Sequence, residues 1–236
     1  MDRNFARALA LVLKSEGGWS DHLADPGGAT MKGVTLASFR RYVKAGATKA
    51  DLRAISDAQV ATVYRRFYWD AVLGAELPDG VDHAVFDFAV NSGPGRAAKY
   101  LQAAVGVAQD GRIGPVTVAA AKAKPAGVTI DALCDARLAF LKRLPTWATF
   151  GRGWSDRVRS VRVQALLMSA QRPAAPVTAA APPRVETSAN GAPSVRLEQP
   201  TPGGKTAAVA GLLVLMAGAL AAVRHQIADF FGSLFR

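Results

Sequence analysis

Residues 5–35 read FARALALVLKSEGGWSDHLADPGGATMKGVT, and the change of pattern within this stretch predicts how the N-terminal part folds. The first half has apolar residues at the spacing of one helical face, namely Phe5, Leu9, Val12 and Leu13. Asp2 or Asn4 is a suitable N-cap, and the Gly-Gly pair at 17–18 ends the helix. The second half, 25–35, combines a proline with paired glycines, which favours a tight β-hairpin.

Residues 1–169 otherwise read as a series of helices. Ser56 and Gln59 have the spacing of a capping box at the start of one helix. Apolar stripes, two of them with a proline in the first turn, predict further helices at 81–91, 94–105, 115–123, 128–143 and 154–168. Strand patterns are nearly absent outside 25–35. The sequence therefore predicts a mainly α domain with a small β-hairpin lobe.

The composition limits the kinds of partner and cofactor. The 236 residues are 50% hydrophobic and 20% charged, which suits an ordered domain with additional segments. A formal net charge of +11 favours an anionic partner, but the basic residues are scattered and match no nucleic-acid-binding motif, so nucleic acid is not expected. Cys134 is the single cysteine, and the three histidines have no metal-ligand spacing. We therefore expect neither a disulfide scaffold nor a metal site.

The C-terminal part differs in composition from the rest. Residues 170–204 contain seven of the 13 prolines among Ala, Thr and Ser, which predicts an extended Pro/Ala-rich linker. Residues 205–223 include eighteen consecutive uncharged residues, enough for one transmembrane helix, the alternative being a buried core helix. The tail, 224–236, is amphipathic and suits a membrane surface. Basic residues interrupt the apolar run at the N-terminus, so no secretion signal is predicted there.

Glu16 is the first candidate for catalysis. It follows Phe5 by eleven residues, so at about 100° per residue it returns to the apolar face of the first helix. Partial desolvation and the C-terminal end of the helix dipole both disfavour the anion there. A carboxyl group that keeps its proton near neutral pH is what a general acid needs. The alternative is a surface glutamate that pairs with Lys32 or Arg3.

The glycine-rich stretch that follows offers a second carboxylate. Asp25 would face a helix-end glutamate across a cleft, as the nucleophile or water-activating base that glycoside hydrolysis commonly uses. Asp-Pro-Gly-Gly is also a common turn in which the aspartate bonds its own backbone. The hydroxyl group of Thr30 or Thr35 is suited to orient a water molecule, or else the two threonines pair across the hairpin.

Six segments together resemble glycoside hydrolase family 108, the bacterial and phage N-acetylmuramidases. In chain order they are EGGW (16–19), ADPGGATMKGVT (24–35), RRFYWD (65–70), DFAVNSG (87–93), LQAAVG (101–106) and DGRIGPVT (110–117). The resemblance covers residues 5–165. It implies a lysozyme-like helical fold and, without a cofactor, cleavage of the β-1,4 bond between N-acetylmuramic acid and N-acetylglucosamine. It also implies a peptidoglycan-binding-like part at about 87–165.

The resemblance assigns roles to individual residues. Glu16 matches the catalytic glutamate of the family's Glu-Gly-Gly motif, and Trp19 stands where that motif often has tyrosine. The order Glu16, Asp25, Thr30 is also similar to that of phage lysozymes, whose threonine lies one residue farther on. The resemblance thus implies Glu16, Asp25 and Thr30 as catalytic residues and Trp19 as an aromatic platform for a sugar ring.

Four more residues are candidates for substrate binding. Asp87 and Asn91 are four positions apart and share one helical face, where they are suited to bond N-acetyl and hydroxyl groups, unless they cap neighbouring backbone. Tyr68 and Trp69 are suited to stack on sugar rings, but aromatic residues at helical spacing are more often part of a core, and we expect this for at least one of the two.

Two hypotheses for the function follow from these features. The first is a peptidoglycan hydrolase, an endolysin or a secretion-associated muramidase, which acts on glycan strands from the periplasmic side of the bacterial inner membrane. Its single C-terminal helix would hold it in that membrane, and its export route is open. The alternative is a membrane-tethered protein that binds peptidoglycan without cutting it, and the helix-end glutamate argues against this.

Overall fold

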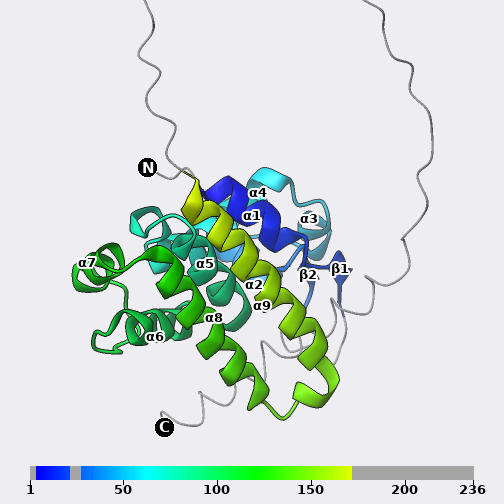
Figure 1. Ribbon diagram of the computed structural model, residues 1–236. Helices are drawn as coiled ribbons and strands as arrows, with labels where there is room; N and C mark the ends of the chain where they lie inside the picture. Colours follow the sequence, from blue (N-terminus) through cyan, green and yellow to red (C-terminus); the bar gives the residue numbers. More distant parts are fainter. Residues whose placement is uncertain (1–3, 22–27, 172–236) are drawn as a thin grey trace, which may run out of the picture.

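The computed structural model describes residues 4–21 and 28–171. Within them the chain is mainly helical, with one small sheet (Figure 1). The helices are α1 (Phe5–Leu13), α2 (Leu36–Tyr42), α3 (Lys49–Arg53), α4 (Asp57–Tyr64), α5 (Val81–Ser92), α6 (Pro94–Val105), α7 (Pro115–Ala123), α8 (Ala126–Lys142) and α9 (Trp147–Ala170). Three short helical segments connect α4 to α5, namely η1 (Arg65–Trp69), η2 (Asp70–Val72) and η3 (Gly74–Glu76).

Helix α5 lies at the centre of this arrangement. All twelve of its residues are buried, and it packs against α1, α6, α8 and α9. Figure 1 shows the long helix α9 running beside α8, and the two helices pack together. A helix that is buried all round must satisfy its polar side chains inside the protein. The polar residues of α5 are therefore the ones whose partners matter most, and they are Asp82, His83, Asp87, Asn91 and Ser92.

The small sheet follows α1 and consists of β1 (Trp19–Ser20), β2 (Thr30–Met31) and β3 (Val34–Thr35). Its strands are antiparallel, and Thr30 pairs with Thr35 across the hairpin. The two turn residues, Lys32 and Gly33, both have left-handed backbone conformations, with φ of 48° and 73°. A two-residue turn of this kind matches the right-handed twist of its strands. The predicted hairpin is confirmed for residues 30–35, and β1 is an additional strand.

Most of the predicted helices are present with small shifts at their ends. The capping box of Ser56 and Gln59 begins α4 as predicted. Helix α9 begins at Trp147, seven residues before the predicted start. The prediction that Asn4 caps α1 is wrong for its side chain, which makes no capping bond. Its amide nitrogen instead donates to the side chains of Asp79 and Asp82, and these two contacts fix the orientation of the Asn4 side chain.

Residues 170 and 171 end the described part of the chain, where α9 stops at Ala170. The remainder of the predicted linker, the predicted membrane helix at 205–223 and the tail at 224–236 lie outside the described residues. No helix within 4–21 and 28–171 is both long enough and apolar enough to cross a bilayer.

Candidate active site

Glu16 lies in the turn that follows α1. Its backbone N–H donates to the carbonyl oxygen of Leu13 over 3.2 Å, so a helical turn continues through Ser15 and Glu16 beyond the end of α1. Its side chain is only 6% exposed. Among the described residues, Oε1 of Glu16 accepts no hydrogen bond. The sequence-based placement of this carboxyl group beside the core is therefore correct.

The β2–β3 turn packs directly against the Glu16 carboxyl group. A Cβ atom added to Gly33 would lie 2.7 Å from Oε2 of Glu16 and 2.2 Å from the hydroxyl oxygen of Tyr64. That hydroxyl group comes from α4 and donates to the backbone carbonyl of Lys32 over 3.1 Å. Gly33 is thus required both by its positive φ and by the close approach of two polar side chains. The hairpin and α4 together fix one side of the site.

Arg157 of α9 faces the other side of the carboxyl group. Its Nη1 lies 3.6 Å from Oε1 of Glu16, and the Arg157 side chain is 7% exposed. The alternative that Glu16 is a surface residue paired with Lys32 is therefore wrong, because the Nζ of Lys32 pairs with Asp57 over 2.7 Å. The Glu16 carboxyl group is therefore buried next to a guanidinium group, whose positive charge favours a nearby anion.

Asp87 of α5 connects Arg157 to a second buried arginine. Nε and Nη2 of Arg157 donate to both carboxylate oxygens of Asp87, with Nη2 to Oδ2 at 2.9 Å. Nη1 of Arg137, from α8, donates to Oδ1 over 2.7 Å. Burial alone would raise the pKa of Asp87, but the two guanidinium groups outweigh it and hold that pKa well below its usual range. Asp87 is thus a carboxylate ion whose charge is shared by two cations.

The chain resembles known proteins over the part of the fold just described. The sequence profile of the glycosyl hydrolase 108 family matches residues 9–93, which hold Glu16, the sheet and α5. Among solved structures, the chain is similar to SagA of Brucella abortus, with 48% sequence identity and a TM-score of 0.65. That match covers 72% of this chain and 98% of SagA. The chain belongs to glycosyl hydrolase family 108.

The prediction made from the sequence motifs is thereby confirmed, and the chain carries a glycoside hydrolase domain. No curated protein matches the chain. The family match ends before α8 and α9, which provide Arg137 and Arg157. The SagA match extends over a larger share of the chain.

Two further residues of the predicted site lie on the small sheet. Trp19 is half-buried on β1, and the guanidinium group of Arg53 lies 4.5 Å from the centre of its ring. The hydroxyl group of Thr30, on β2, donates to the carbonyl oxygen of Gly28 over 3.0 Å. Thr35 caps α2 by accepting a hydrogen bond from the backbone of Ser38. The roles of Trp19 and Thr30 stay predictions, and Asp25 lies outside the described residues.

The aromatic and polar candidates on η1 and α5 are buried. Trp69 is 1% exposed and packs edge-on against Phe86, with ring centres 5.4 Å apart, whereas Tyr68 is 8% exposed. This places Trp69 in the core, as we expected for at least one of the pair. Asn91 accepts a hydrogen bond from the hydroxyl group of Ser92 over 3.1 Å. Of these candidates Asp87 contacts Arg157 directly, and contact with a sugar stays a prediction for Asp87, Asn91, Tyr68 and Trp69.

Arg157, Arg137 and Tyr64 were not among the residues predicted for the site. A signal for the two arginines does exist in the sequence. Arg157 is three positions after Trp154 and Arg137 is four positions after Leu133, so each lies on the apolar stripe of its helix. Arginine is almost never fully buried unless it is paired, so a cation on such a stripe indicates a buried ion pair. The identity of the partner, however, is not visible in the stripe.

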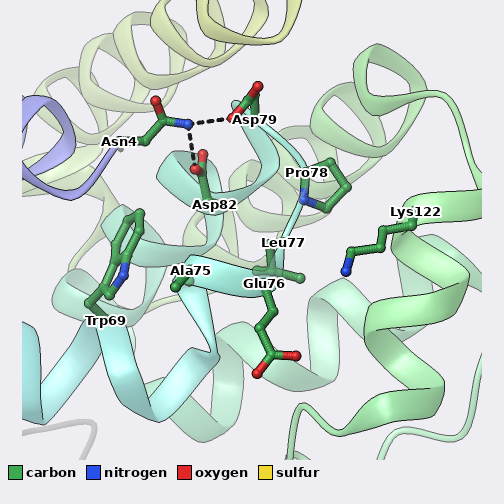
Figure 2. A pocket seen from close by; sticks show the side chains of 10 residues that line it. Asn4, Trp69, Ala75, Glu76, Leu77, Pro78, Asp79, Asp82 and Lys122 are labelled. Atoms are coloured by element: carbon green, nitrogen blue, oxygen red, sulfur yellow. Dashed lines mark hydrogen bonds between the residues drawn. The ribbon is translucent and has the colours of Figure 1, made fainter. Parts of the chain in front are cut away.

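A separate pocket lies at the other end of α1 (Figure 2). It has a volume of about 580 Å³ and is lined by Asn4, Trp69, Gly74, Ala75, Glu76, Leu77, Pro78, Asp79, Asp82 and Lys122. The amide of Asn4 donates to Asp79 and to Asp82, each over 2.7 Å. Burial raises the pKa of Asp82 to about 6, against the hydrogen bonds that it accepts. Glu16 and Arg157 do not line this pocket, so it is distinct from the candidate active site.

The described residues contain no group of three or more metal-binding side chains that would hold a metal ion. The site around Glu16 instead consists of a carboxyl group, a neutral hydroxyl group and two guanidinium groups around a second carboxylate. This set of groups is suited to proton transfer and to stabilising charge on a reacting oxygen.

Proposed function

We propose that this glycoside hydrolase cleaves peptidoglycan at the β-1,4 bond between N-acetylmuramic acid and N-acetylglucosamine. The proposal rests on Glu16, a carboxyl group that is held beside the core between the β2–β3 turn and Arg157. Membership in glycosyl hydrolase family 108 supports the substrate class. The formal net charge of +11 suits a wall that carries carboxylates and phosphates.

In the proposed reaction Glu16 is the general acid. It donates its proton to the glycosidic oxygen as the bond to the anomeric carbon breaks, and water supplies the new hydroxyl group at that carbon. Asp25 is the proposed second carboxylate, and it either attacks the anomeric carbon or activates the water. Thr30 is proposed to orient that water from β2. An NMR measurement of which anomer forms first distinguishes attack by Asp25, which retains the configuration, from attack by water, which inverts it.

Trp19 is the proposed platform for a sugar ring. Arg53 lies against its ring, which restricts the ring's rotation and leaves less freedom to lose when a sugar binds. Tyrosine at this position keeps an aromatic face, whereas alanine does not. We therefore expect Trp19→Tyr to retain the KM for glycan strands and Trp19→Ala to raise it, with kcat less affected.

The substitution that tests the function is Glu16→Gln in the full chain. Glutamine keeps the shape of the side chain but has no proton to transfer to the leaving oxygen. We expect release of reducing ends from purified peptidoglycan to fall by about 10²–10⁴-fold. Glu76→Gln is the matched control, because Glu76 is exposed and is the other glutamate among the described residues. Unchanged cleavage by Glu16→Gln would contradict the assignment.

The products of the wild-type chain identify the bond. After reduction with borohydride, cleavage on the reducing side of N-acetylmuramic acid leaves muramitol, whereas cleavage of the other β-1,4 bond leaves glucosaminitol. An anhydro end without a new reducing end would indicate a transglycosylase instead. Binding of glycan strands with no new end of any kind would support the alternative of a tethered binding protein.

We also propose that residues 205–223 hold the enzyme in the inner membrane, with the catalytic domain on the periplasmic side. The uncharged run of eighteen residues and the proline-rich stretch before it support this. Fractionation of cells that express the full chain, compared with a chain that ends at Arg172, tests the anchor. Equal recovery of both in the membrane fraction would contradict it.

A further inference from the structure

Four charged side chains are buried together around the candidate active site. They come from the turn after α1, from α5, from α8 and from α9, and none is more than 7% exposed: Glu16, Asp87, Arg137 and Arg157. An ion buried among other charges depends strongly on how those charges pair, because the interior screens them much less than water does. The pairing within this cluster therefore determines how Arg157 affects the ionisation of Glu16.

Asp87 holds Arg157 in a fixed orientation. The Nε and Nη2 edge of the guanidinium group is engaged by both oxygens of Asp87. This two-point contact is the strongest arrangement between arginine and a carboxylate. Nη1 of Arg157 lies 3.6 Å from Oε1 of Glu16, which is longer than a hydrogen bond. Asp87 thus takes the edge of Arg157 that would otherwise be available to Glu16.

Arg137 opposes this effect. It shares Asp87 by donating to Oδ1 over 2.7 Å, which is the same oxygen that accepts from Nε of Arg157 over 3.1 Å. Arg137 therefore draws part of the negative charge of Asp87 away from Arg157. It also adds a positive charge to the interior next to the site.

We propose that Asp87 is a positioning residue for the reaction, which keeps Arg157 from forming a full ion pair with Glu16 and so allows Glu16 to carry a transferable proton. This inference rests on the proposed function and adds to it a residue that acts through Arg157, without touching the substrate. In this role Asp87 acts on the site through Arg157 and does not contact an N-acetyl or hydroxyl group of the substrate.

Among residues 4–21 and 28–171, the other groups near Glu16 do not change charge in the neutral range. Tyr64 of α4 presents a neutral hydroxyl group, and Lys32 of the turn directs its charge to Asp57. His83 of α5 interacts with the same cluster, and burial lowers its pKa, so it stays neutral. In the proposed reaction the alkaline limb of the pH profile reflects loss of the proton from the general acid.

Two substitutions in the full chain are expected to move that limb in opposite directions. Asp87→Asn frees the edge of Arg157 to bind Glu16, so activity is lost at a pH lower by about one unit or more. Arg137→Met leaves Asp87 entirely to Arg157 and removes a nearby cation, so activity persists to higher pH. Arg137→Met keeps one cation on Asp87 and is the variant expected to fold if Asp87→Asn does not.

The measurements are the pH dependence of kcat/KM on soluble peptidoglycan fragments and a ¹³C-carboxyl NMR titration of Glu16, assigned by its disappearance in Glu16→Gln. A merely structural role of Asp87 would lower kcat, or the amount of folded protein, without moving either the limb or the titration. If folded variants show the same midpoints as the wild-type chain in both the pH profile and the NMR titration, the proposal is overturned. If the wild-type chain cleaves no glycan, the proposed function fails, whereas the NMR titration still decides the role of Asp87.

Discussion

Asp82 and Asp87 lie five residues apart on α5 and are both buried, yet their pKa values move in opposite directions. Within the described part of the chain, Asp82 accepts hydrogen bonds from neutral groups, namely the amide of Asn4 and the backbone N–H groups of Gly80 and His83. These do not outweigh burial, which raises the pKa of Asp82 to about 6. Asp87 has two guanidinium groups, and they reverse the effect of burial.

The two aspartates attach opposite ends of α1 to the central helix. Asn4 at the start of α1 bonds to Asp82, and Glu16 after its end faces Arg157, which Asp87 holds. The start of α1 is thus fixed by a hydrogen bond from a neutral amide to Asp82, whose pKa is raised. The end of α1 is fixed by a cluster of positive and negative side chains. The direction in which the pKa of a buried carboxyl group moves thus depends on the charge of its partners and not on their number.

The largest effect on stability is expected for Asp87→Asn. The change leaves two buried guanidinium groups without their carboxylate, and removal of one member of a buried ion pair costs about 3–5 kcal/mol of unfolding free energy. Urea denaturation at neutral pH measures this loss. Asp156→Asn is the matched control, because Asp156 pairs with Arg159 on the surface. A loss as small as that of the control would mean that the cluster contributes little to the fold.

Asp82→Asn is expected to change how stability depends on pH. The folded-state pKa of about 6 lies above the ordinary value of 3.8, so the contribution of Asp82 is fully present below pH 3.8 and is lost as pH rises to about 6. The difference between these two pKa values corresponds to roughly 3 kcal/mol of unfolding free energy. Asparagine has no such titration, so the unfolding free energy of the wild type relative to the variant should fall over this range. A constant difference between the two in urea denaturation would contradict the raised pKa.

Gly33→Ala tests how closely the hairpin holds the Glu16 end. The added methyl group meets the hydroxyl oxygen of Tyr64 and Oε2 of Glu16, and alanine is also strained at a φ of 73°. We expect a loss of about 2 kcal/mol of unfolding free energy together with reduced glycan cleavage. Gly46→Ala is the control, because nothing lies within 4 Å of its added methyl group. Equal thermal stability and activity of the two variants would show that the turn moves freely away from Glu16.

Tyr64→Phe is expected to have the smallest effect. It removes one hydrogen bond to the carbonyl oxygen of Lys32 and leaves the ring in place, at a cost of about 1 kcal/mol. Thermal unfolding measures this change. Cleavage should keep its pH optimum, since Tyr64 contributes no charge to the cluster. A shifted optimum would place Tyr64 among the groups that control the proton of Glu16.

Local patterns in the chain predicted much of this fold. The apolar face of α1, the capping box of α4 and the hairpin at 30–35 all depend on residues a few positions apart. The burial of Glu16 followed from its angular position relative to Phe5. Helical periodicity, caps and turn residues are short-range properties, which is why a single sequence is sufficient to predict them.

The partners of the buried charges were decided by tertiary packing alone. Arg137 and Arg157 are 50 and 70 positions away from Asp87, and their helices meet around α5 only in the folded chain. Nothing in the pattern around positions 82 and 87 distinguishes the two aspartates, since both lie on the same buried helix. The sequence by itself determined that the carboxyl group of Glu16 lies beside the core, because its angular position follows from helical periodicity. Only the tertiary structure decided which buried carboxyl groups meet a cation, because a charge interacts with whatever lies within a few ångströms, however distant in the chain.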